Sequence, residues 1–287
     1  MIVGPVSNWS ARTEHRSYNF GFQKRSIEMF QKLTRTAIVV LIIFTVGTIH
    51  AADWGTLKGQ IIYDGTPPKP KKINVTKDIP TCTKHHPLDE RLLVDSKTKG
   101  IKDVAIFIRV KRGQKLAVHS DYDKTAKDKV ILDNRHCRFE PRICLVRTSQ
   151  TLVVTNSDPV GHNTNAGGLF NNPAFNVVVS ADGNEFKLKK AERRAAPVSC
   201  SIHPWMQAYL VVRDDPYMTV SAKDGKFEIK NIPAGEHEFA FWQQAAGHLR
   251  YAKFTGGKTT RRGRVKIKID GVVDVGKVVV DPKIFKL

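Results

Sequence analysis

The chain has 287 residues, four cysteines and a formal net charge of +20, with 47 lysines and arginines against 27 acidic residues. Such a charge could suit nucleic acid, but the chain contains no nucleic-acid recognition motif. The haem-attachment motif Cys-x-x-Cys-His is absent as well. A strongly basic protein attracts acidic partners or anionic polymers, and salt weakens this attraction.

The first 51 residues have the pattern of a secretory signal peptide. Lys32 and Arg35 form a positive region, residues 37–46 form an apolar run, and residues 49–51 resemble a cleavage site. A membrane-spanning helix needs about 20 apolar residues, and this run is shorter. We therefore predict a signal peptide over residues 1–51, with Met29 as an alternative start and an uncleaved anchor as the alternative reading. Either way, the rest of the chain is periplasmic or secreted.

The remaining chain, of about 235 residues, suggests one large or two small domains. Its apolar stretches are short, alternate with polar residues, and end at turn residues, which is typical of strands. Up to residue 155 the predicted strands cover residues 55–63, 104–110, 130–132, 144–146 and 151–155. No segment of the exported part has a convincing helical period. We predict an all-β protein without a membrane span after signal cleavage.

Three of the cysteines lie before residue 150, and an oxidising compartment would let two of them pair. We favour a disulfide between Cys82 and Cys137, because Cys82 lies in a loop rich in proline, lysine and histidine. The alternative pair is Cys137 with Cys144. Cys144 lies in an apolar run and resembles a small buried hydrophobic residue. A zinc site built from these cysteines with His85, His86 and His136 is a third reading, but its spacing matches no known zinc motif.

The main chemical signal combines two segments, residues 156–163 and residues 200–206. The first contains His162 just after a predicted strand. The second contains Cys200, His203 and Met206 on a short loop between the apolar runs 195–199 and 208–212. A thiolate, two imidazoles and a weak thioether are the ligand set of a blue-copper electron-transfer site.

These segments resemble the cupredoxins, in particular the plastocyanin- and amicyanin-like members, whose short loop also has the spacing Cys-x2-His-x2-Met. The Asn-x-Asp-x-x-x-His-Asn segment is similar to the cupredoxin strand that ends in the first histidine ligand. The resemblance covers residues 131–213 and implies a Greek-key β-sandwich with one type 1 copper ion. It implies His162, Cys200 and His203 as equatorial ligands and Met206 as the axial ligand. It also implies that Asn163 fixes the cysteine loop through a side-chain hydrogen bond.

Residues 216–287 have a different character, with alternating runs at residues 221–229, 232–242 and 265–269. They resemble a carboxypeptidase-regulatory, prealbumin-like β-sandwich, whose usual first strand is matched only by residues 55–65. We therefore expect a copper domain over residues 52–215 and a second sandwich over residues 216–287. The first strand could instead belong to the second sandwich. More of the chain, including the Trp-Gly-x-Leu-x-Gly stretch at residues 54–59 and the Asp-Gly-Lys-Phe-Glu-Ile stretch at residues 224–229, resembles secreted bacterial proteins labelled methylamine-utilisation-like.

The function implied by this ligand set is single-electron transfer, because four protein ligands leave no position for a substrate. Multicopper oxidases and copper nitrite reductases need further histidines, commonly as His-x-His, which the chain lacks. We therefore predict that it is not an enzyme. We expect an acidic redox partner, such as a cytochrome or a dehydrogenase, to exchange electrons at His203. The expected docking residues are Ile202, Pro204 and Trp205, with Leu169 and Phe170 as additions.

Two other function classes remain open from the sequence. One is a binding or structural module of the cell envelope, held to an anionic polymer by its basic surface, in which copper is incidental or lost. The other is copper storage or delivery, although four methionines do not make the exposed Met-rich tract typical of such proteins. Reversible redox chemistry at one tightly held copper would separate electron transfer from both.

Overall fold

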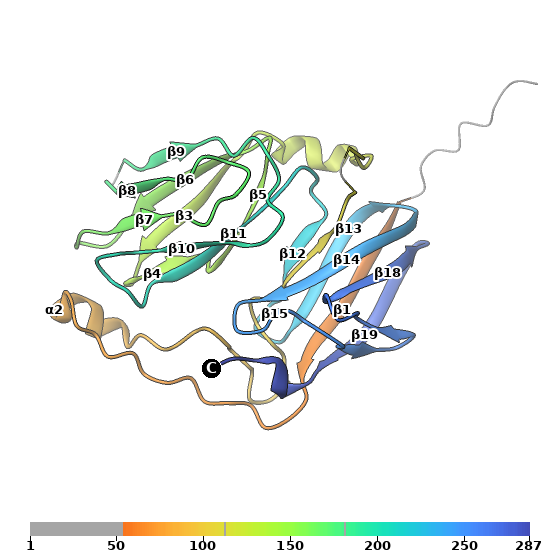
Figure 1. Cartoon of the computed structure of the whole chain (residues 1–287), viewed down its shortest axis with the longest axis horizontal. Coiled ribbons are helices and arrows are strands. Elements are labelled where there is room, and N and C mark those ends of the chain that lie inside the picture. The colour runs from red at the N-terminus through yellow and green to blue at the C-terminus, as the bar shows by residue number, and fades with distance from the viewer. Residues whose placement is uncertain (1–53, 112, 181) are drawn as a thin grey trace, which may run out of the picture. The chain divides into compact units, whose positions relative to one another are not determined.

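The computed structural model describes residues 54–111, 113–180 and 182–287. The predicted signal peptide lies outside these residues. The described chain is all-β, as predicted, and forms two β-sandwiches of two sheets each (Figure 1). In these residues no helix is both long enough and apolar enough to cross a membrane.

The first sandwich, called here the site sandwich, is built from the strands β3 to β11. One sheet has the order β4 (Arg138–Glu140), β3 (Lys129–Arg135), β6 (Thr151–Asn156) and β9 (Asn184–Phe186). The other has the order β5 (Ile143–Arg147), β11 (Gln207–Arg213), β10 (Ala196–Ser199), β7 (Asn163–Asn165) and β8 (Asn176–Val178). β3 pairs in parallel with β6, and β5 pairs in parallel with β11.

The second sandwich, called here the framework sandwich, contains strands from both ends of the described chain. One sheet has the order β13 (Lys226–Pro233), β1 (Trp54–Tyr63), β19 (Val272–Val280), β16 (Lys253–Phe254) and β17 (Gly257–Lys258). The other has the order β12 (Met218–Val220), β2 (Ala105–Ile108), β14 (Gly235–Gln243) and β15 (Gly247–His248), and β18 (Arg264–Ile269) also pairs with β14.

The strand pairings show which sandwich contains β1 and β2. β1 pairs antiparallel with β13 and parallel with β19, so the first strand belongs to the framework sandwich. This assignment is the alternative expected from the sequence for residues 55–65. The expected copper domain over residues 52–215 also included residues 104–110, but β2 pairs with β12 and β14 in the framework sandwich. The site sandwich therefore lies between framework strands in the sequence.

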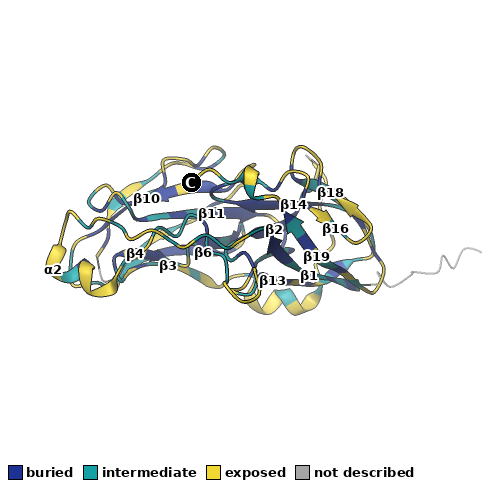
Figure 2. Ribbon diagram, turned by 90° about the horizontal axis from the view of Figure 1, so that it is seen from below, coloured by how far each residue is buried: buried dark blue, intermediate teal, exposed yellow. Residues whose placement is uncertain are grey.

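Each sandwich has its own apolar core, because side chains alternate between the two faces of a strand. In β13 the inward Phe227 and Ile229 alternate with the outward Lys226 and Glu228. Of the predicted strand over residues 221–229, residues 221–225 form the turn between β12 and β13, and only residues 226–229 are strand. Gly225 lies in this turn with φ of 82°, and a Cβ atom there would come within 2.3 Å of a backbone oxygen of β1. Figure 2 shows the buried residues running along the strands.

A third apolar cluster joins the two sandwiches. β2 is buried on both faces, so that Ile106 and Ile108 face the framework core while Ala105 and Phe107 face the site sandwich. Across this junction, the buried Arg213 of β11 donates a hydrogen bond to the carbonyl oxygen of Ile108. The junction is thus both apolar and hydrogen-bonded.

Helical structure in the described residues is limited to short elements of three to six residues. These are α2 (Ile79–Cys82) and the 3-10 turns η1 (Thr83–His85), η2 (Ser120–Thr125) and η3 (Pro282–Ile284). α2 and η1 lie on a long excursion between β1 and β2 that crosses from the framework sandwich to the site sandwich (Figure 1). This excursion brings residues of a loop to the predicted metal ligands.

Candidate metal centre

The two predicted ligand segments lie at the ends of neighbouring strands. β6 leads into the turn that carries His162, and β7 begins at the next residue. β10 and β11 form a hairpin whose connecting loop carries Cys200, His203 and Met206. Since β10 also pairs with β7, the loop and His162 meet at one end of the site sandwich.

Three of the predicted ligands converge on one point. The Nδ1 atoms of His162 and His203 are 3.0 Å apart. The Sγ atom of Cys200 is 3.9 Å from each of them. Two donors on one ion, with bonds of about 2.0 Å to nitrogen and about 2.3 Å to sulfur, cannot be more than about 4.3 Å apart for a nitrogen and a sulfur, or about 4.0 Å apart for two nitrogens. All three separations meet these limits, so these residues fit a single metal ion without rearrangement.

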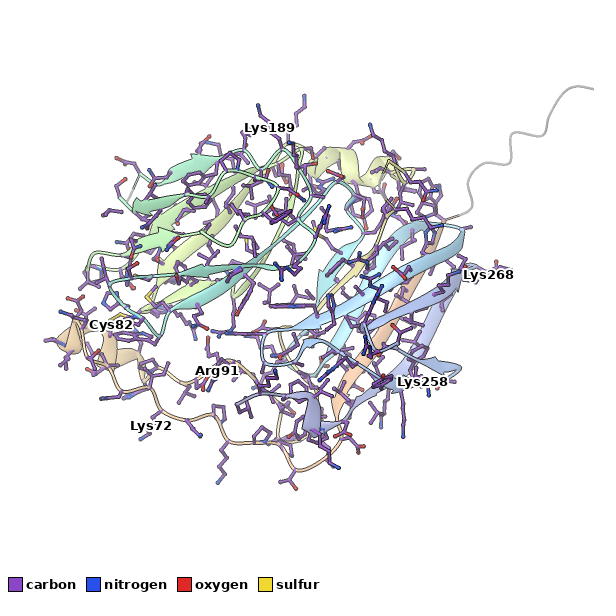
Figure 3. All side chains as sticks on the ribbon, in the orientation of Figure 1. Lys72, Cys82, Arg91, Lys189, Lys258 and Lys268 are labelled. Atoms are coloured by element: carbon purple, nitrogen blue, oxygen red, sulfur yellow. A yellow bond between two sulfur atoms is a disulfide. The ribbon has the colours of Figure 1, made fainter. Side chains whose placement is uncertain are left out.

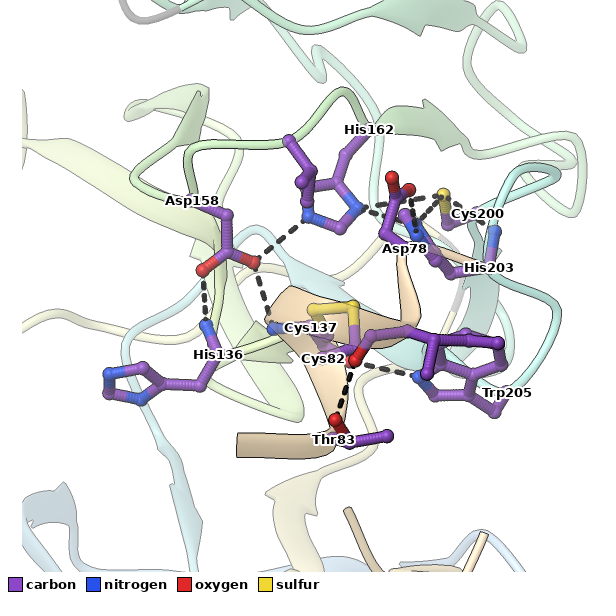
Figure 4. Close-up of a disulfide and its surroundings, with 12 residues drawn as sticks. Asp78, Cys82, Thr83, His136, Cys137, Asp158, His162, Cys200, His203 and Trp205 are labelled. Atoms are coloured by element: carbon purple, nitrogen blue, oxygen red, sulfur yellow. Dashed lines mark hydrogen bonds and ion pairs between the residues drawn. A yellow bond between two sulfur atoms is a disulfide. The ribbon is translucent and has the colours of Figure 1, made fainter. Parts of the chain in front are cut away.

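The outer nitrogen of each histidine, Nε2, lies within hydrogen-bond distance of a carboxylate. His162 Nε2 lies 2.9 Å from Asp158, and His203 Nε2 lies 2.8 Å from Asp78 (Figure 4). An ionised carboxylate only accepts hydrogen bonds, so each Nε2 is the donor. The lone pair of a neutral ring is then on Nδ1, which faces the other two donor atoms. Such carboxylate partners orient metal-binding histidines and raise their basicity.

Asn163 holds the cysteine loop in place. Its Oδ1 atom accepts hydrogen bonds from the backbone N–H groups of Ser201 at 2.6 Å and Ile202 at 3.4 Å. Its Nδ2 atom donates to Asn176 of β8 at 2.7 Å. Cys200 Sγ in turn accepts a hydrogen bond from the backbone N–H of His203 at 3.4 Å. The loop geometry therefore depends on this side chain, in the position that the resemblance implied.

Without a metal, the donor groups titrate as a coupled set. Burial lowers the pKa of His162, but its interactions with Asp158 and Cys200 outweigh this and raise the pKa to about 9. Burial raises the pKa of Cys200, but its interactions with His162 and backbone N–H groups hold that pKa below the usual range. For His203, burial and the neighbouring His162 lower the pKa. The site thus favours a thiolate at Cys200, which is the form that binds metals.

Met206 is buried next to these residues. Its side chain is 1% exposed and belongs to the same apolar cluster as Cys200. The loop is closed by hydrogen bonds from the Met206 N–H to the His203 carbonyl at 2.9 Å and from the Cys200 N–H to the Met206 carbonyl at 3.3 Å. Met206, the fourth predicted ligand, therefore lies on the same loop as Cys200 and His203 and is buried like them.

A disulfide anchors both outer carboxylates. Cys82 and Cys137 are bonded, which is the pairing favoured from the sequence. Cys137 donates its backbone N–H to Asp158 at 2.8 Å, so this half of the disulfide positions the partner of His162. Cys82 ends α2, and its N–H bonds to the carbonyl oxygen of Asp78, the partner of His203. Figure 4 shows the disulfide between the two histidine–carboxylate pairs.

The expected docking residues have mixed exposure. His203 itself is fully buried, although it was expected to be the point of electron exchange. Pro204 is exposed, whereas Ile202 and Trp205 are partly buried. The indole N–H of Trp205 donates to the carbonyl oxygen of Cys137 at 3.1 Å, and its ring packs edge-on against His203. The added residues differ as well, since Phe170 is 70% exposed and Leu169 is buried.

The structure also bears on the alternative zinc site and on the predicted burial of Cys144. The alternative zinc site needed cysteine ligands, but both Cys82 and Cys137 are in the disulfide. The rings of His85 and His136 pack against each other, with centroids 4.6 Å apart. Cys144 is a free, fully buried thiol, as expected for a core residue, and burial raises its pKa to about 12.

Two residues of the centre were missed by the sequence analysis. Asp158 lies within the segment that was matched to the cupredoxin strand, four residues before His162, but no role was given to it. Asp78 lies 125 residues from its partner His203 in the sequence. The one local signal at Asp78 is that it is the only acidic residue within the lysine-rich stretch 69–86.

Comparison with known proteins gives partial matches among solved structures. A scan against protein families finds no match, and no curated protein matches. An amicyanin variant with Cu(I) is 14% identical and has a TM-score of 0.24, covering 30% of this chain and 82% of its own. A copper-containing nitrite reductase from Thermus scotoductus SA-01 is 15% identical with a TM-score of 0.27, covering 37% of this chain and 25% of its own.

A third match is a purple cupredoxin from Nitrosopumilus maritimus. It is 23% identical and has a TM-score of 0.23, covering 30% of this chain and 99% of its own. All three TM-scores are low and each match covers less than half of this chain. They assign the chain to no family.

Proposed function

We propose that this chain is an exported type 1 copper protein that carries single electrons between redox partners. His162, Cys200 and His203 would hold the copper as equatorial ligands, with Met206 as the axial ligand. The observation that carries the proposal is the convergence of Cys200 Sγ and two Nδ1 atoms at 3.0 to 3.9 Å, with both outer nitrogens occupied by carboxylates. Bound copper would supply one-electron chemistry at this point.

The donor set favours copper over zinc. Trigonal sites of two histidines and one cysteine, with a distant methionine, are typical of blue copper, whereas catalytic zinc sites keep a position open to water or substrate. Here the four side chains are at most 1% exposed. The protein's part is to exclude water, hold the donors in a fixed arrangement and present a thiolate. None of these roles involves a bound substrate.

The export part of the proposal is supported by the disulfide. Disulfides persist in oxidising compartments and are rare in the cytosol. Cys82 and Cys137 are 55 residues apart in the sequence and join a loop to the site sandwich. We therefore place the protein in the periplasm or outside the cell.

The test is the visible absorption and electron paramagnetic resonance spectrum of the purified protein loaded with Cu(II). We expect an intense thiolate-to-copper charge-transfer band that Cys200→Ser abolishes. Cys144→Ala is the matched control, because Cys144 is the other free cysteine of the described residues and lies in the core. This variant should keep the band. A colourless wild-type protein, or a band that survives Cys200→Ser, would overturn the proposal.

A second measurement separates electron transfer from copper storage or delivery. An electron carrier keeps its metal in both oxidation states, so repeated reduction and reoxidation should leave the band at full strength without copper in the filtrate. Release of copper on reduction would favour storage or delivery. Copper binding without reversible redox would favour the envelope-binding module.

A further inference from the structure

The proposed ligands are almost completely shielded from solvent. His162 and His203 are 0% exposed, and Cys200 and Met206 are 1% exposed. Electron exchange weakens steeply as the layer of protein between donor and acceptor thickens. A redox partner must therefore dock where the shortest connection from a ligand reaches the surface.

One such connection passes through Asp78. The outer nitrogen of His162 bonds to Asp158, whose side chain is only 3% exposed. The outer nitrogen of His203 bonds to Asp78, whose side chain is 38% exposed. A single hydrogen bond of 2.8 Å thus joins a proposed ligand to a residue that a partner can touch.

Asp78 belongs to a short segment, residues 77–86, called here the cap. Within the cap, Lys77, Lys84, His85 and His86 are exposed, and Ile79 presents an apolar side chain that is 52% exposed. The carboxylate of Asp78 is turned inward to His203. The outer surface of the cap therefore consists of basic side chains around the apolar side chain of Ile79.

The cap is held in place before any partner arrives. α2 and η1 give it local hydrogen bonds, and the disulfide at Cys82 joins it to the site sandwich. Asp78 has φ of 42°, in the left-handed region that aspartate adopts more readily than most residues. A rigid surface binds with a smaller loss of conformational entropy than a mobile one.

We propose that the cap is the docking surface for the redox partner, and that the partner presents an acidic patch to it. This inference rests on the proposed function. One electron would move between the partner's redox group and the copper centre by way of Asp78 and His203, and no bond to a substrate would form or break. The surface around Pro204, expected from the sequence to be the docking site, would then play a minor part.

A paramagnetic probe tests the surface without copper. Hexacyanochromate(III) is a redox-inert anion that broadens the NMR signals of nearby amides. Added to the isotope-labelled metal-free protein, it should broaden the amide signals of the cap more than those of any other segment. Strongest broadening around Pro204, or equal broadening over all lysine-rich surfaces, would overturn the proposal.

Charge-reversal variants test the same surface in electron exchange. The double variant Lys77→Glu with Lys84→Glu should slow oxidation of the reduced copper protein by hexacyanoferrate(III) by at least about tenfold at low ionic strength, and high salt should remove the difference. The matched control is Lys253→Glu with Lys258→Glu, which changes the net charge equally on the β16–β17 hairpin. Figure 3 shows Lys258 on the framework sandwich and Cys82 beside the site sandwich.

The outcomes distinguish the two proposals. Equal slowing of both double variants would show that only net charge matters, and it would overturn the cap as docking surface. Slowing by Pro204→Glu but not by the cap variant would return the docking site to Pro204. A wild-type protein without the blue band would instead refute the proposed function, while the NMR experiment on the metal-free protein would still report on the cap.

Discussion

The two sandwiches use buried polar side chains in different ways. In the framework sandwich such side chains bond to the backbone. Ser221 donates to the carbonyl oxygen of Ile101 at 2.7 Å, and Thr259 donates to that of Leu249 at 2.6 Å. These bonds satisfy groups that would otherwise be costly to bury.

In the site sandwich some buried polar side chains, such as Asn134, also bond to the backbone, but one group of buried polar atoms faces a common centre. The inner nitrogens of His162 and His203 and the sulfur of Cys200 point to this centre, while the outer nitrogens bond to carboxylates and the sulfur accepts a backbone N–H. Both domains are β-sandwiches, but the buried polar groups of the framework sandwich support its backbone, whereas those of the site sandwich include a cluster of possible metal donors. The difference predicts that stability and copper chemistry can be changed separately.

The largest expected effect on stability comes from the framework core. Phe241 is 1% exposed and packs edge-on against Phe227. Phe241→Ala removes most of this buried side chain and should lower the free energy of unfolding by about 3–5 kcal/mol. Denaturant unfolding would measure this loss, and the blue band under native conditions should be unchanged. Loss of the band before unfolding would show that the two sandwiches are not separable in this way.

Removal of the disulfide should affect both properties. The double variant Cys82→Ser with Cys137→Ser frees the chain between residues 82 and 137 and should lower the free energy of unfolding by about 2–4 kcal/mol. It should also loosen Asp78 and Asp158, so that copper exchanges faster with a chelator. Unchanged copper exchange would mean that the carboxylates are positioned without the disulfide.

The smallest effect on stability is expected at the proposed axial ligand. Met206→Leu nearly conserves volume in a buried position and should cost less than about 1.5 kcal/mol. The reduction potential should rise, because an axial thioether tunes the potential of such sites. Voltammetry of the copper-loaded variant would measure the shift. Complete loss of copper would argue against an axial role, and an unchanged potential would show that Met206 is only core packing.

Local patterns predicted the ligand loop well. The hairpin of β10 and β11 was expected from two apolar runs, and its loop was expected to carry Cys200, His203 and Met206. Within one short loop, the spacing of residues in the sequence determines which side chains can lie close together. Asn163 was found by resemblance for the same reason, since it adjoins His162.

Non-local features could not be predicted in this way. β2 is buried on both faces, so its sequence is a plain apolar run that does not indicate which sheet it joins. β19 was missed because its alternation is interrupted where the register with β1 shifts, next to Gly276 with φ of 63°. Asp78 reaches His203 only through the fold of a long loop. Its one local signal, an acidic residue within a lysine-rich stretch, does not indicate which histidine it would contact.

The pairing of β1 also has a consequence for synthesis. Gln60 of β1 donates a hydrogen bond to the carbonyl oxygen of Asp224, 164 residues later in the chain. As the chain becomes available for folding from its amino end, β1 must therefore wait for β13 and β19, which follow the whole site sandwich in the sequence. The site sandwich has its own core and can fold first. Until β13 and β19 arrive, β1 is an unpaired strand with exposed backbone groups, and this is the stage at which the nascent chain is most prone to aggregate.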